Sequence, residues 1–166
     1  MCVTSSSDTA DLAVDALCDW WRRSQPHYPQ AKRLLIEADS GGSNAARSRR
    51  YKKRLQDFAD ESGLEITVSH YPPGTSKWNP IEHRMFSVIS GNWAGEPLGS
   101  YETVLKYIRT ARTESGFRCR ACLDRTNYPA RQRVAAKDKA RVRLKPHPVL
   151  PKWNYTILPH RPHGNR

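Results

Sequence analysis

The hydrophobic pattern of this chain changes between the spacing of helices and the spacing of strands. Apolar residues recur every three or four positions in four segments, whereas two short segments are continuously apolar or alternate. These patterns predict helices over 9–23, 45–61, 79–92 and 101–113, and strands over 32–38 and 64–70. Asp8 or Thr9 caps the first helix, and Gly63 ends the second. The order of elements predicts an α/β fold.

The predicted core draws on all of these elements. The run Leu34-Leu35-Ile36 shows no polar alternation, so we expect helices to cover both faces of its strand. The residues expected in the core are Leu17, Trp20, Leu35, Ile36, Leu55, Phe58, Ile66, Val68, Met85, Ile89, Leu105 and Ile108. A sheet of two strands would leave both strands with bare edges, which native domains avoid. We therefore expect further strands, and their natural place is before Met1.

The net charge of +12 is concentrated at one end of the chain. Residues 1–117 carry 15 Lys and Arg against 14 Asp and Glu, whereas residues 118–166 carry 13 against 2. We expect two parts, a nearly neutral globular domain over 1–117 and a basic C-terminal extension over 118–166. Because Lys and Arg bind nucleic acids by neutralising phosphates, DNA is the expected partner. The alternative is a solvated tail that only aids solubility.

Other classes of protein find little support in the sequence. The longest apolar runs are far shorter than the ~18 residues of a membrane helix, and the N-terminus lacks a basic region followed by an apolar core. Cys119 and Cys122 have metal-ligand spacing, but no second pair completes a zinc site, so we expect ordinary thiols. We expect a cytoplasmic protein with no membrane partner and no small-molecule cofactor.

Two carboxylates stand where folding could bring them together as ligands for Mg²⁺. Asp39 ends the first predicted strand, at the edge where open α/β sheets place ligands. Glu82 begins the third helix, and apolar residues follow it at helical spacing, so we expect its carboxylate along the core-facing stripe. A buried unpaired carboxylate favours a nearby cation. Without a metal, Glu82 is a first-turn residue that the helix dipole stabilises, and Asp39 is a turn residue before two glycines.

Cationic and aromatic residues around these acids are candidates for DNA contact. They are Lys77, Trp78, His83, Arg84, Arg47, Arg50 and Arg54. Lys77 and Trp78 precede Glu82 in a loop, where a cation and an aromatic ring can hold a phosphate and stack on a base. Packing is the alternative role for Trp78, and His83 and Arg84 are otherwise solvated helix residues.

Four motifs in this sequence resemble the DDE transposases of bacterial ISAzo-type insertion sequences. They are ADSGGSN at 38–44, HYPPGTSKWNPIEHR at 70–84, NWAGEPL at 92–98 and WNYTI at 153–157. The resemblance covers about residues 8–159 and implies an RNase H-like fold, in which Asp39 is the second acid of the catalytic triad and Glu82 the third. In such enzymes two Mg²⁺ ions about 4 Å apart support DNA strand cleavage and transfer.

The likeness departs from the family at its beginning. In the family a three-stranded meander, which carries the first catalytic Asp, precedes the first helix, and no such strand follows Met1 here. We therefore expect a truncated RNase H-like fold that lacks the meander and is inactive alone. Asp8 is not taken as a substitute, because it reads as part of a helix start. Two other functions stay open: a non-catalytic DNA-binding remnant that binds a full-length transposase, and a small RNase H-like nuclease.

Overall fold

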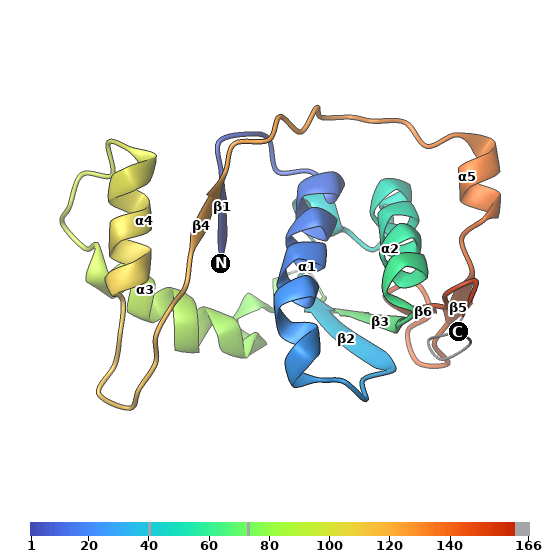
Figure 1. Cartoon of the computed structure of the whole chain (residues 1–166), viewed down its shortest axis with the longest axis horizontal. Helices are drawn as coiled ribbons and strands as arrows, with labels where there is room; N and C mark the ends of the chain where they lie inside the picture. The colour runs from blue at the N-terminus through green and yellow to red at the C-terminus, as the bar shows by residue number, and fades with distance from the viewer. Residues whose placement is uncertain (40, 73, 162–166) are drawn as a thin grey trace. The chain divides into compact units, whose positions relative to one another are not determined.

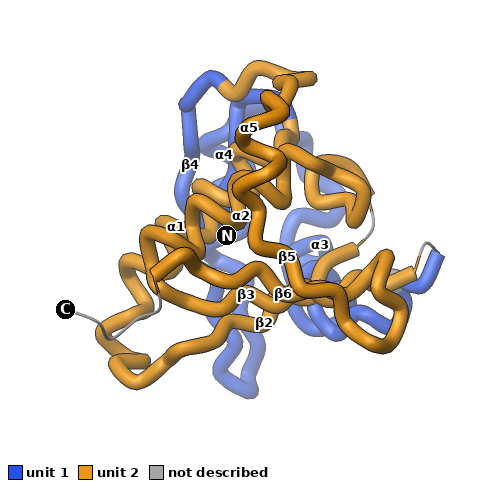
Figure 2. The backbone as a smooth tube through the Cα atoms, turned by 90° about the vertical axis from the view of Figure 1, so that its right-hand side faces the viewer, with its two compact units in different colours: residues 1–7, 74–127 blue, residues 8–73, 128–166 orange. Residues whose placement is uncertain are grey.

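The computed structural model describes residues 1–39, 41–72 and 74–161, and its chain divides into two compact units (Figure 2). Unit 1 comprises residues 1–7 and 74–127, and unit 2 comprises residues 8–73 and 128–166. The units therefore do not divide at the predicted boundary between 117 and 118, because each unit uses two separate stretches of chain. Within the described ranges, no helix is both long enough and apolar enough to cross a bilayer.

Two helices of unit 2 lie side by side and pack on the same face of a sheet (Figure 1). Hydroxyl side chains cap both: Thr9 caps α1 (Ala10–Ser24), and Ser48 caps α2 (Arg49–Ser62), each by accepting a hydrogen bond from a first-turn N–H group. Gly63 ends α2 with a φ of 73°, which a residue without Cβ adopts at little cost. The caps at Thr9 and Gly63 confirm two predictions. The helix α2 begins four residues later than predicted, because the cap is Ser48, whose backbone is extended.

The sheet of unit 2 has four strands in the order β2-β3-β6-β5. Their bounds are β2 (Arg33–Ala38), β3 (Glu65–His70), β5 (Leu144–Pro146) and β6 (Asn154–Ile157). The strands β2 and β3 are parallel, whereas β6 is antiparallel to both β3 and β5. Both predicted strands are confirmed, but the expectation that this chain supplies only two is wrong. The strands β5 and β6 span three and four residues in a basic, proline-containing stretch, so they are too short to show alternation.

One face of this sheet is apolar and buried. The register places Leu34, Ile66 and Ile157 in one row across β2, β3 and β6, and these residues belong to the core that α1 and α2 cover. The row beside it includes Val68 and Tyr155, which are 0% and 1% exposed. Burial of such side chains is the main favourable contribution to folding.

The opposite face of the sheet is polar. Leu35 aligns there with Thr67 and Thr156, whose hydroxyl oxygens lie 2.9 Å apart. Leu35 is 60% exposed, so the prediction that helices cover both faces of its strand is wrong for the part of the chain that the structure describes. The side chains of β2 therefore alternate between a buried and an exposed face, although the sequence Leu34-Leu35-Ile36 is continuously apolar.

Unit 1 consists of helical segments and a short parallel ladder. The predicted helix over 79–92 is confirmed from residue 80, and it contains a π-helical segment, Glu82–Phe86, before α3 (Ser87–Asn92). The helix α4 (Tyr101–Thr110) confirms the fourth predicted helix and ends three residues early. Ile89 and Ile108 form the buried centre of this unit. The strands β1 (Cys2–Thr4) and β4 (Cys122–Asp124) pair in parallel and were not predicted.

Most of the predicted core is buried or half-buried. The buried members are Leu55, Phe58, Ile66, Val68, Ile89, Leu105 and Ile108, and the half-buried ones are Leu17, Ile36 and Met85. Leu35 and Trp20 are exceptions, and the prediction is wrong for both. Trp20 is 42% exposed beside Trp21, with ring centroids 6.0 Å apart. Adjacent residues on a helix point about 100° apart, so Trp21 faces the core and Trp20 does not.

Because one face of the sheet is buried and the other is exposed, we expect substitutions on the two faces to change the free energy of unfolding by different amounts. Ile66→Ala removes a fully buried side chain and should lower the free energy of unfolding by about 2–5 kcal/mol. Leu35→Thr changes an exposed position and should alter it by less than about 0.5 kcal/mol. Urea unfolding of the full chain measures both. A cost for Leu35→Thr comparable to that for Ile66→Ala would show that this face is covered.

Candidate functional site

Asp39 follows β2 at the carboxyl end of the strand, and its side chain is exposed. A Cβ built on Gly41 would lie 3.4 Å from Asp39 Oδ2, so the carboxylate lies against the backbone of the following turn. At Gly42, which has a φ of 54°, Asp8 Oδ2 stands 2.9 Å from where a Cβ would be. A side chain at Gly42 would therefore displace Asp8 as well as strain the backbone.

Asp8 has a role that the sequence did not reveal. Because Thr9 caps α1, the Asp8 carboxylate is available elsewhere, and its Oδ1 accepts a hydrogen bond of 2.8 Å from Ser43 Oγ. Asp8 and Asp39 thus contact neighbouring residues of one turn, η2 (Gly42–Asn44) and the glycine before it. Asp8 positions this turn. The clue in the sequence was that two residues, Asp8 and Thr9, competed for one cap.

His70 lies next to Ala38, the residue before Asp39, and connects three segments of unit 2. It is 5% exposed, and it is paired with Ala38 in the sheet register. Its Nδ1 lies 2.7 Å from the Trp153 carbonyl oxygen, and its Nε2 lies 2.8 Å from the Asn44 carbonyl oxygen. Both partners are acceptors, so a doubly protonated ring would donate to both and a neutral ring to one. The end of β3 is thereby tied to the turn after Asp39 and to the start of β6.

Glu82 lies in the first turn of the helical segment of unit 1, as predicted, and its N–H donates to the Asn79 carbonyl oxygen over 3.1 Å. Its side chain is exposed, so the prediction that it lies along the core-facing stripe is wrong. The cause is the π-helical hydrogen bond from the Ser87 N–H to the Glu82 carbonyl oxygen. This wider turn changes the angle between Glu82 and the buried Ile89. Such turns are frequent at functional sites.

The other candidates in unit 1 cluster around the same turn. Lys77 Nζ lies 5.7 Å from the centroid of the Trp78 ring, and Trp78 is 64% exposed. His83 Nε2 lies 2.7 Å from the Lys77 carbonyl oxygen, so His83 joins the loop to the helix. Arg84 is exposed. An exposed aromatic ring beside a cation is suited to stacking on a base next to a phosphate.

Arg50 and Arg54 have partners inside unit 2 that the sequence analysis did not anticipate. Arg50 binds Asp11 through two guanidinium nitrogens, at 2.9–3.1 Å. Arg54 forms ion pairs with Asp11, Asp15 and Asp57. Burial alone would lower the pKa of Arg54, but these carboxylates raise it. The two arginines hold α1 against α2.

The spacing of acidic and basic residues in the sequence could have indicated these ion pairs between α1 and α2. Asp11 and Asp15 are four residues apart on α1, and Arg50 and Arg54 are four residues apart on α2, so each pair lies on one helix face. Arg47, the remaining candidate on this side, is exposed. The guanidinium group of Arg47 is therefore accessible to a phosphate, whereas Arg50 and Arg54 are engaged by carboxylates.

Asp39 and Glu82 suit a hard cation. Both are exposed carboxylates, and neither forms an ion pair within the described part of the chain, so their oxygens are available to a metal such as Mg²⁺. Asp39 belongs to unit 2 and Glu82 to unit 1. Among the residues placed by the structure, no three His, Cys, Asp or Glu side chains form a ready metal cluster. That these two acids share a metal therefore stays a prediction.

Glu37 lies in β2, two residues before Asp39, and is the weaker metal candidate. It is exposed, and its Oε2 accepts a hydrogen bond of 3.1 Å from the Tyr71 hydroxyl group. The phenol gives this carboxylate a partner, whereas the carboxylate of Asp39 lies against a glycine turn. Glu37 therefore serves as a matched comparison for Asp39.

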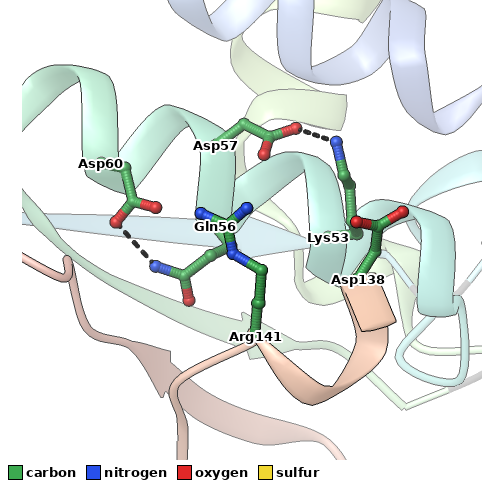
Figure 3. A pocket seen from close by; sticks show the side chains of 6 residues that line it. All are labelled: Lys53, Gln56, Asp57, Asp60, Asp138 and Arg141. Carbon is green, nitrogen blue, oxygen red and sulfur yellow. Dashed lines mark hydrogen bonds and ion pairs between the residues drawn. The ribbon is translucent and has the colours of Figure 1, made fainter. Parts of the chain in front are cut away.

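A polar hollow between α2 and α5 (Ala136–Ala140) lies elsewhere in unit 2 (Figure 3). It is lined by Lys53, Gln56, Asp57, Asp60, Asp138 and Arg141. Gln56 Nε2 donates to Asp60 Oδ1 over 2.9 Å and to the Leu158 carbonyl oxygen over 3.0 Å. His160 donates its backbone N–H to Asp60 Oδ1 over 2.8 Å. These bonds fasten the segment after β6 to α2.

The chain matches the family model described as Rhodopirellula transposase DDE domain over residues 1–159. The match extends well past residue 117 and includes β5 and β6. No curated protein and no solved structure matches the chain.

The Asp60 contacts predict a dependence of stability on pH. Burial alone would raise the pKa of Asp60, but the hydrogen bonds from His160 and Gln56 lower it. The stabilisation is therefore complete above the ordinary Asp pKa of about 4 and is lost as pH falls through the lower folded-state value. Asp60→Asn should lower the free energy of unfolding by about 1 kcal/mol at pH 7, and by progressively less below pH ~4. Denaturant unfolding across pH measures this, and a constant difference would contradict it.

His70 should be essential for the stability of unit 2. His70→Phe keeps a ring but leaves the carbonyl oxygens of Asn44 and Trp153 without this donor, which should cost about 2–4 kcal/mol. Ser69→Ala provides the control, because Ser69 makes one long hydrogen bond of 3.3 Å to Asn154 and should cost less than about 1 kcal/mol. Equal costs for the two variants in urea unfolding would contradict the role assigned to His70.

Proposed function

This chain belongs to the Rhodopirellula transposase DDE domain family, and on that premise we propose that it serves DNA transposition. It does so as part of an RNase H-like catalytic domain whose intact form cleaves DNA and transfers the strands. The observation that carries the proposal is the position and exposure of the Asp39 carboxylate. This residue presents an exposed carboxylate at the end of a parallel strand, held by a glycine turn. Open α/β sheets place their ligands at such positions.

Asp39 and Glu82 are proposed to hold the metal. Two bound Mg²⁺ ions would supply an activated water or DNA 3′-OH and would stabilise the leaving oxygen. The protein contributes a fixed position for each acid. The hydrogen bond between Asp8 and Ser43 holds the glycine turn beside Asp39. The π-helical segment directs Glu82 toward solvent. Their role in DNA strand cleavage is to bind cations where DNA can reach them.

A further acid is proposed to come from a strand added along β2. In the described sheet, β2 lies at the end of the strand order, so one of its edges can accept another strand. A full-length transposase that binds this chain would provide that strand together with the first catalytic Asp. Without this acid, we expect the 166-residue chain to cleave DNA very weakly.

DNA contacts near the metal are proposed for Lys77, Trp78, His83, Arg84 and Arg47. Lys77 and Trp78 offer a phosphate contact and a stacking surface, and His83 fixes their loop. The basic stretch over 118–166 adds affinity that does not depend on sequence, since Lys and Arg address phosphates. Its contribution is best tested by substitution, because ending the chain at residue 117 would remove Tyr155 and Ile157 from the core.

Removing one proposed metal ligand should weaken divalent cation binding. Asp39→Asn should lower the affinity of the full chain for Mn²⁺, a substitute for Mg²⁺ that calorimetry and proton relaxation detect, by about tenfold or more. Glu82→Gln should do the same. Glu37→Gln is the control, because it removes an equal charge only two residues before Asp39 and should change the affinity less than about twofold.

Two results would count against this proposal. One is an equal loss of Mn²⁺ affinity in Glu37→Gln and Asp39→Asn, which would indicate a diffuse charge effect. The other is the absence of Mn²⁺ binding by the unsubstituted chain at millimolar concentrations. Strong DNA cleavage by the unsubstituted chain would instead favour the small RNase H-like nuclease, and would overturn the need for an added strand.

A further inference from the structure

A second hollow lies on α2 in unit 2, near its start. It has a volume of about 230 Å³ and is lined by Arg49, Lys52, Lys139, Val142 and Leu144. The first two residues come from α2, and Lys139 comes from α5. Val142 lies between α5 and β5, and Leu144 is the first residue of β5. Three cations from segments almost ninety positions apart in sequence thus surround a partly apolar floor.

The three cations lack the carboxylate partners that their neighbours on α2 have. Lys53, Arg50 and Arg54 are all in ion pairs. No acidic residue lines the hollow, and across the described residues none of its three cations forms an ion pair. The charges of this hollow are therefore available to an anion from outside.

Lys52 gives the strongest physical reason for an anionic ligand. It is half-buried, and its Nζ lies 4.8 Å from the centroid of the buried Tyr155 ring. This burial lowers the pKa of Lys52, and no nearby carboxylate raises it again. An ammonium group that has lost part of its water and has no counter-ion gains more from a bound anion than an exposed lysine does.

The floor of the hollow distinguishes it from a plain anion site. Val142 and Leu144 pack against the core and expose part of their side chains between the cations. A nucleic acid backbone alternates phosphates with less polar sugars, so cations beside apolar side chains match its chemistry.

We propose that this hollow binds the DNA backbone, with Arg49, Lys52 and Lys139 on phosphates and Val142 and Leu144 against deoxyribose. The site rests on the proposed function only because it takes DNA as the ligand, and it requires neither Asp39 nor Glu82. It contacts the DNA backbone and does not read base sequence.

The test compares two variants of the full chain in DNA binding. Lys52→Gln/Lys139→Gln removes two cations of the hollow, and Lys53→Gln removes a cation of the same helix that is paired with Asp57 over 2.6 Å. Affinity for a labelled duplex is measured by fluorescence anisotropy at several salt concentrations. Each phosphate contact contributes about 0.9 to the slope of log affinity against log salt. The double variant should lower this slope by about 1.8, whereas Lys53→Gln should leave it unchanged.

Further arms of the experiment separate the alternatives. Arg49→Gln alone should lower the slope by about 0.9, so the site stays testable if the double variant folds poorly. An unchanged slope in both Lys52→Gln/Lys139→Gln and Arg49→Gln would overturn this site while leaving the metal proposal intact. Absence of DNA binding by the unsubstituted chain would overturn this site and the DNA contacts of the proposed function together. Inorganic pyrophosphate that binds the hollow more tightly than the duplex would show that the ligand is a free phosphate compound and would overturn the DNA assignment.

Discussion

The parallel pairing of β2 with β3 is the constraint on which unit 2 depends. Its register fixes which side chains face α1 and α2, and it aligns Ala38 with His70 at the carboxyl end of both strands. The imidazole of His70 then reaches the carbonyl oxygens of Asn44 and Trp153, so the turn after Asp39 and the start of β6 are held together. The apolar face and the position of the candidate acid therefore come from one backbone arrangement.

The ion pairs between α1 and α2 divide the basic residues into two groups with different roles. Arg50 and Arg54 neutralise acids on α1, which allows two charged helix faces to pack together. Arg49 and Lys52, on the same helix, face a region without carboxylates. A net charge gives the excess of cations over anions in a protein, but only the ion pairs that these cations form show which of them a phosphate can bind.

Sequence patterns predicted what depends on local chemistry and missed what depends on distant partners. The caps at Thr9 and Gly63 and the positions of β2 and β3 in the sequence were predictable because capping and periodicity are local. The exposure of Leu35 was not, because it depends on Thr67 and Thr156 of neighbouring strands. At the candidate site, Asp39 at a strand end and Glu82 in a first helical turn were placed as predicted. The outward direction of Glu82 depends on a π-helical turn, which the hydrophobic pattern does not predict.

Residues 128–161 of the basic C-terminal stretch are part of unit 2, and this changes how their charge can act. Tyr155 and Ile157 of β6 are buried, and Gln56 binds both the Leu158 carbonyl oxygen and the Arg143 N–H group. Folding therefore holds Lys139, Arg141 and Arg143 beside α2, whereas a loose tail would spread its charge over many positions. A fixed cation loses little conformational entropy when it meets a phosphate, so each held charge contributes more to binding than an equal charge on a flexible tail. The stability of unit 2 and the phosphate binding that we propose for its cations should therefore be coupled through β6.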